Sequence, residues 1–76
     1  MMTIKETLKN KENPVVKVYP VCGRVEAVVY ENNVETGEKV MFGTMTKAHA
    51  ELTDCGMVKT GEVSGSVLAV YARKAA

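Results

Sequence analysis

The plausible soft or borderline metal ligands, which include the possible cysteine nucleophiles, are few in this chain of 76 residues. They are Cys22, His49, Asp54 and Cys55. A structural zinc site normally draws on several cysteine or histidine ligands in closely spaced pairs, and no such pair occurs here. We therefore expect neither a metal nor any other cofactor.

Catalysis by a cysteine and a histidine would also need an orienting group and an oxyanion site within a cleft, which a chain this short rarely supplies. Cys55 falls on a predicted apolar helix stripe, where a cysteine acts as a small buried hydrophobe. His49 is predicted to lie at the surface. The glycines are too scattered for a phosphate-binding loop. We expect a protein that is not an enzyme.

Nucleic-acid binding is one of two functions that the sequence leaves open. Lys17, Tyr19, Arg24 and Arg73 lie in or beside segments rich in strand-forming residues, and a sheet that exposes them could stack bases and hold phosphates. A domain of this kind usually has a pI above about 9, whereas the pI here is about 7.8. The aromatic fraction of 5% is also low, so we treat nucleic-acid binding as the alternative.

Binding to another protein is the function we favour. Residues 25–62 carry seven acidic against three basic side chains, and Glu31, Glu35 and Glu38 fall together around a predicted hairpin tip. Met41 and Met45 follow, and exposed methionines form adaptable apolar contact surfaces. These five residues predict a partner-binding site that acts by charge complementarity or strand addition. By analogy of size and class with small phage-encoded inhibitors, the protein would be an adaptor or an inhibitor that occludes a partner's surface.

The elements that would position these side chains form an α+β domain. Residues 15–21, 24–31 and 39–45 have the alternating or β-branched pattern of strands, and a loop of about five to seven residues separates the second from the third. Pro20 lacks an amide proton, so the first strand is at a sheet edge or ends there. Residues 62–72 form the last strand, which is apolar on both faces and therefore central.

One helix is predicted over residues 46–55, with Thr44 or Thr46 as N-cap and Gly56 after its end. Its apolar stripe consists of Met45, Ala48, Leu52 and Cys55. The prediction is an antiparallel sheet of three to four strands with this helix packed on one face, in the order (α)βββαβ.

The amino-terminal residues 1–13 are predicted to be flexible or to form a short helix around Ile4 and Leu8, followed by a single domain over residues 14–76. They lack the apolar core of a signal peptide, and no stretch of the chain approaches the roughly 20 apolar residues of a membrane span. Two cysteines are too few for a disulfide framework, so we expect a cytoplasmic protein with free thiols. A homodimer is a further expectation, because a second copy could cover an exposed sheet face.

Overall fold

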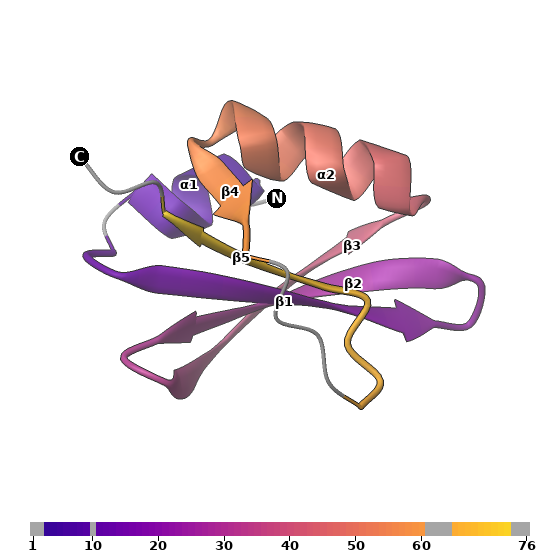
Figure 1. The fold of residues 1–76 in the computed structure, drawn as a ribbon, viewed down its shortest axis with the longest axis horizontal. Helices are drawn as coiled ribbons and strands as arrows, with labels where there is room; N and C mark the ends of the chain where they lie inside the picture. Colours follow the sequence, from indigo (N-terminus) through magenta and orange to yellow (C-terminus); the bar gives the residue numbers. More distant parts are fainter. Residues whose placement is uncertain (1–2, 10, 61–64, 74–76) are drawn as a thin grey trace.

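The computed structural model describes residues 3–9, 11–60 and 65–73. Within these ranges the elements are α1 (Ile4–Lys9), β1 (Pro14–Val21), β2 (Arg24–Glu31), β3 (Val34–Phe42), α2 (Met45–Asp54), β4 (Met57–Lys59) and β5 (Ala69–Arg73). The described strands form one five-stranded antiparallel sheet in the order β3-β2-β1-β5-β4. Helices α1 and α2 lie on the same side of it (Figure 1). The predicted α+β class is confirmed, with β4 as an additional short strand.

Two-residue turns connect the first three strands. Cys22 and Gly23 join β1 to β2 with φ of 47° and 81°, and Asn32 and Asn33 join β2 to β3 with φ of 54° and 65°. Turns with positive φ at both central residues match the right-handed twist of paired strands. Each hairpin therefore begins its ladder directly at the turn, at Val21↔Arg24 and at Glu31↔Val34.

The predicted loop of five to seven residues between β2 and β3 is wrong. Strand β3 begins at Val34, and Thr36 and Gly37 lie inside it rather than in a loop. The register between the strands shifts between Val28 and Tyr30, and Gly37 has a φ of 88°. A glycine with positive φ occurs in some bulges as well as in turns, so Gly37 indicates irregular backbone without distinguishing a bulge from a turn.

Strand β1 lies in the middle of the sheet and ends at Val21, one residue after Pro20, so of the two alternatives predicted from Pro20 the edge position is wrong and the strand end is right. Pro20 is opposite Val25 of β2, while the pairing of β1 with β5 extends only as far as Val18. The backbone nitrogen of Pro20 faces away from β2, toward the side of β1 where β5 has already ended, so the missing amide proton costs no ladder hydrogen bond.

The last strand is shorter than predicted, because β5 begins only at Ala69. A turn at Gly65 and Ser66 precedes it, and residues 62–64 of the predicted strand lie outside the described residues. Strand β5 runs between β1 and β4 in the sheet, which confirms its predicted interior position.

Helix α2 begins and ends where its local signals indicate. The Oγ1 of Thr44 accepts a hydrogen bond from the backbone N–H of Lys47 at 3.2 Å, and Gly56, with φ of 82°, follows the Cys55 cap. Ala48 and Leu52 are fully buried, and Met45 and Cys55 pack at the margin of the core, as the predicted stripe requires.

The core lies between the helices and one face of the sheet. Its buried cluster includes Ile4 and Leu8 of α1, Val16 and Val18 of β1, and Leu52 of α2. Among the described residues, neither α1 nor α2 is long and apolar enough to cross a membrane.

Candidate binding face

The sheet face opposite the helices carries the main candidate site. Because alternate residues of a strand point to opposite faces, the register assigns each side chain to the helix side or to this side, which we call the open face. Its members on β1 and β2 are Val15, Lys17, Tyr19, Val21, Arg24, Glu26, Val28 and Tyr30. Its members on the other strands are Glu35, Lys39, Met41, Val58, Val70 and Ala72.

Two tyrosines lie flat across the open face. Tyr19 stands four residues along β1 from the position opposite Tyr30, a separation of about 13 Å at ~3.3 Å per residue. Their hydroxyl oxygens are nevertheless only 3.3 Å apart. The two side chains must therefore extend toward each other along the sheet instead of standing away from it. Val28 lies between them in the register, and it is only 5% exposed although neither helix covers this face.

Tyr30 is also in contact with a cation. The Nζ of Lys17 lies 4.7 Å from the centroid of the Tyr30 ring, within the range of a cation–π interaction. The hydrogen bond with Tyr19 raises the pKa of Tyr30 to about 12, with partial burial as the next cause and the negative charge of Glu35 as a smaller one. Tyr30 therefore stays a neutral phenol at any physiological pH.

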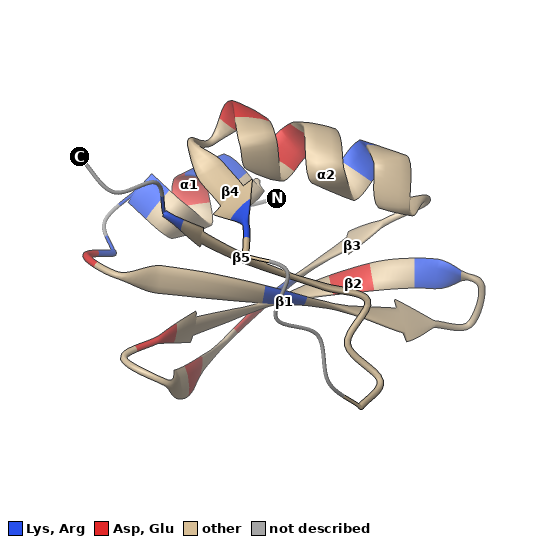
Figure 2. Ribbon diagram, in the orientation of Figure 1, with Lys and Arg blue, Asp and Glu red and all other residues tan. Residues whose placement is uncertain are grey.

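Charges of both signs frame the tyrosines. Lys17, Arg24 and Lys39 supply three positive charges on the open face, and Glu26 and Glu35 supply two negative charges. Figure 2 shows the basic position where β2 begins and acidic positions on both arms of the β2–β3 hairpin. The net charge of this face is small, so its contact chemistry depends more on the tyrosines and valines than on charge.

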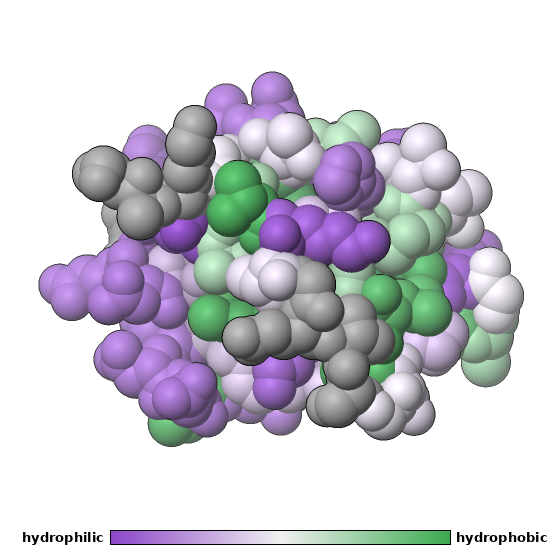
Figure 3. Space-filling model, in the orientation of Figure 1, coloured by the Kyte–Doolittle hydropathy of each residue, from purple (hydrophilic) through white to green (hydrophobic). Residues whose placement is uncertain are grey.

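Apolar and hydrophilic surfaces are unevenly distributed over the molecule. The end nearest the β2–β3 turn is largely hydrophilic in the view of Figure 3. On the open face, Met41 is 44% exposed, and Val58 is exposed to the same extent. Accessible methionine and tyrosine side chains on one face are a combination typical of contact surfaces.

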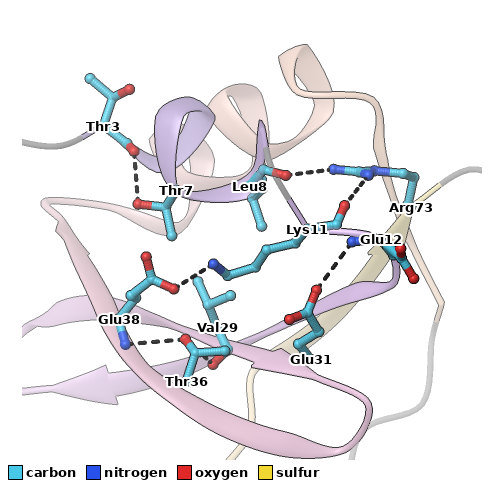
Figure 4. Close-up of polar contacts among 10 residues, drawn as sticks. All are labelled: Thr3, Thr7, Leu8, Lys11, Glu12, Val29, Glu31, Thr36, Glu38 and Arg73. Atoms are coloured by element: carbon cyan, nitrogen blue, oxygen red, sulfur yellow. Dashed lines mark hydrogen bonds and ion pairs between the residues drawn. The ribbon is translucent and has the colours of Figure 1, made fainter.

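The four residues of the nucleic-acid alternative do not all lie together. Lys17, Tyr19 and Arg24 share the open face, but Arg73 does not. The guanidinium of Arg73 donates hydrogen bonds to the backbone carbonyls of Lys11 at 2.6 Å and Leu8 at 2.8 Å (Figure 4). Arg73 thus holds the carboxyl end of α1, on the helix side of the sheet.

The five residues of the favoured protein-binding prediction are dispersed more widely. Glu31 accepts a hydrogen bond from the backbone N–H of Glu12 at 3.1 Å (Figure 4). Glu35 and Met41 lie on the open face. Met45 packs in α2 against the core.

Glu38 forms an ion pair with Lys11, with the Nζ and Oε1 atoms 2.6 Å apart (Figure 4). The hydrogen bond from the Lys11 ammonium lowers the pKa of the Glu38 carboxyl. Glu31 and Glu38 therefore fasten the segment between α1 and β1, and their carboxylates are engaged within the molecule.

The open face contains several residues that neither predicted site includes, among them Lys39 and Val70. The alternation in β2 already indicated that Val28 and Tyr30 share a face with Glu26. The alternation does not reveal which strands pair with β2. That pairing places Lys17 of β1 and Lys39 of β3 on either side of Val28.

The thiols are in different settings. Cys22 is exposed in the β1–β2 turn, and Cys55 is half-buried. Burial raises the pKa of the Cys55 thiol, and the charges of Asp54 and Glu51 add to this effect. Within the described ranges, no three side chains of His, Cys, Asp or Glu lie together so that they could hold a metal ion.

No protein family model, curated protein or solved structure matches this chain.

Proposed function

We propose that this protein is a small non-catalytic interaction module that binds another protein through the open face of its sheet. The observation that carries the proposal is the one-sided placement of α1 and α2, which leaves a sheet face of apolar, tyrosine and charged side chains without a helix over it. An adaptor or inhibitor of this kind would act by covering a surface of its partner, and we expect it to do so in the cytoplasm.

The composition of the open face supports this function. Tyrosine, methionine and arginine are enriched in the buried centres of protein interfaces, and Tyr19, Tyr30, Met41 and Arg24 occur together here. The mutual hydroxyl contact of the tyrosines fixes their side chains before binding, so little side-chain entropy is lost when a partner packs on them.

Strand β3 offers a second contact next to the open face. It is an edge of the sheet, and its residues from Val34 to Gly37 are exposed. An edge strand can accept an extended segment of a partner by β-augmentation. The bulge and the charged side chains along β3 oppose indiscriminate pairing of this kind.

A single-stranded nucleic acid is the second candidate ligand for the same face. Lys17, Tyr19 and Arg24 of the sequence-based prediction lie together on it, and flat tyrosine rings are suited to base stacking. It ranks second because Glu26 and Glu35 on the same face would repel phosphates.

The two candidates are separated by affinity capture from a nuclease-treated cell extract with three forms of the protein. Met41→Glu places a charge on the open face, and Ala50→Glu is the control at an exposed position of α2, away from the open face and from β3. The proposal predicts a stoichiometric protein captured by the wild type and by Ala50→Glu but not by Met41→Glu.

Three other results would change the conclusion. Equal capture by all three forms would refute the open face as the contact surface. Recovery of nucleic acid alone from untreated extract, with an affinity that falls steeply with salt, would establish the second candidate. A dimer in light scattering that Met41→Glu dissociates would identify a second copy of this chain as the partner.

A further inference from the structure

A separate cleft lies on the helix side of the molecule, away from the open face. It has a volume of about 340 Å³ and is lined by Met45, Thr46, His49, Lys59 and Tyr71. The first three residues belong to α2, Lys59 ends β4, and Tyr71 is in β5. The cleft therefore depends on tertiary packing of three elements and is not a feature of one helix end.

One hydrogen bond in the cleft joins its histidine to a buried tyrosine. The Tyr71 side chain is fully buried, and its hydroxyl oxygen lies 2.6 Å from the Nδ1 of His49. The two rings are tilted by 52° with centroids 5.6 Å apart. Burial raises the pKa of Tyr71, so this phenol keeps its proton at neutral pH.

A protonated phenol can donate to an unprotonated Nδ1 or accept from Nδ1–H, so this contact fits either neutral tautomer of the imidazole. When the phenol donates, the imidazole carries its proton on Nε2. His49 is exposed, so in that tautomer the Nε2–H is an accessible hydrogen-bond donor.

The other polar groups that line the cleft can also donate hydrogen bonds. Lys59 contributes an ammonium group, which forms no hydrogen bond or ion pair within the described residues. Thr46 contributes a hydroxyl, and Met45 supplies an apolar wall. Among the described residues that line the cleft there is no carboxylate.

We propose that this cleft binds a small organic anion, whose carboxylate or phosphate group is held by Lys59 and the Nε2–H of His49 and whose apolar part contacts Met45. Small-molecule sites usually span about 300–1,000 Å³, so a cleft of about 340 Å³ suits a single ring or a short chain. The site does not depend on the open face, and a small ligand here could bind at the same time as a protein partner there.

The test is an NMR titration of the full chain with benzoate and phenyl phosphate, and with benzamide as the uncharged control. His49 is the only histidine, so its ring nitrogens can be followed without ambiguity. We expect either anion to bind saturably and to shift the His49 Nε2 resonance, and benzamide to bind at least tenfold more weakly. The stronger of the two anions identifies the preferred group.

Two variants and a matched control connect this binding to the cleft. Lys59→Gln should weaken the binding of the better anion about tenfold, whereas Lys47→Gln, which removes the same charge from α2 outside the cleft, should not weaken it. Tyr71→Phe should leave the His49 ring as a mixture of tautomers, which the nitrogen shifts report directly. The backbone amide spectrum of each variant verifies that it is folded.

Specific results would overturn the proposal. They are the absence of saturable shifts with both anions, equal binding of benzamide, or an equal loss of affinity in Lys47→Gln and Lys59→Gln. A His49 ring of the folded wild type that carries its proton on Nδ1 would also overturn it.

Discussion

Replacing Arg73 with methionine should detach α1 and destabilise the protein. A helix of six residues is unstable alone, and its last carbonyls have no partners within the helix. The Arg73 guanidinium supplies donors to the carbonyls of Leu8 and Lys11 across 65 and 62 positions of the sequence. The same helix contributes Ile4 to the core, so its attachment also keeps apolar surface buried.

The expected size of this effect follows from the two bonds. A hydrogen bond to a charged group contributes roughly 1.5–3 kcal/mol, and the exposure of Arg73 places both bonds at or below the lower end of that range. We expect a loss of about 2 kcal/mol, a large part of the roughly 3–5 kcal/mol that a core of this size supplies. Methionine keeps the apolar stem, so the change isolates the donors.

The assay is urea denaturation followed by circular dichroism, together with hydrogen exchange at the amides of α1. Arg24→Met, at an exposed position at the start of β2, is the matched control and should change stability by less than about 0.5 kcal/mol. Equal stability of the two variants, or unchanged protection of the α1 amides in Arg73→Met, would refute the role assigned to this arginine.

Two predictions concern pH. Tyr19→Phe should lower the pKa of Tyr30 from about 12 toward 10, because the hydrogen bond with Tyr19 is the main cause of the raised pKa. The ring carbon shifts of Tyr30, followed against pH, measure this pKa. An unchanged pKa of Tyr30 in Tyr19→Phe would contradict the assigned cause. The Lys11–Glu38 pair should stabilise the fold by less than about 1 kcal/mol above the pKa of an unfolded glutamate, and this contribution should vanish as the pH falls through the lowered pKa of Glu38. Glu38→Gln should flatten that part of the acid denaturation profile, and an unaltered profile would argue against the pair.

The elements that the sequence predicts well are those whose signals are local. The N-cap at Thr44 and the glycine after Cys55 lie within one turn of the ends of α2, and both act through backbone geometry that their own residue types dictate. The interior position of β5 was also predictable, because apolar residues on both faces suit only a flanked strand.

The features that were mispredicted depend on contacts between distant segments. Gly37 permits a bulge as readily as a turn, and only the pairing of β3 with β2 decides between them. The two cleft residues joined by a hydrogen bond, His49 and Tyr71, are 22 positions apart, and a histidine in isolation gave no sign of its partner. The alternation within a strand assigns a face, but it does not reveal which strands lie beside it.

This difference changes which experiment can decide the function. Charge reversal at Glu31, Glu35 and Glu38 follows naturally from the sequence, where the three residues form one acidic tip. In the folded protein, Glu31 and Glu38 hold the segment between α1 and β1, so their replacement by lysine would weaken the fold as well as change the surface charge. A loss of binding in that variant could not be assigned to a contact. Met41 is exposed on the open face, so its substitution changes the proposed interface while leaving those internal contacts in place.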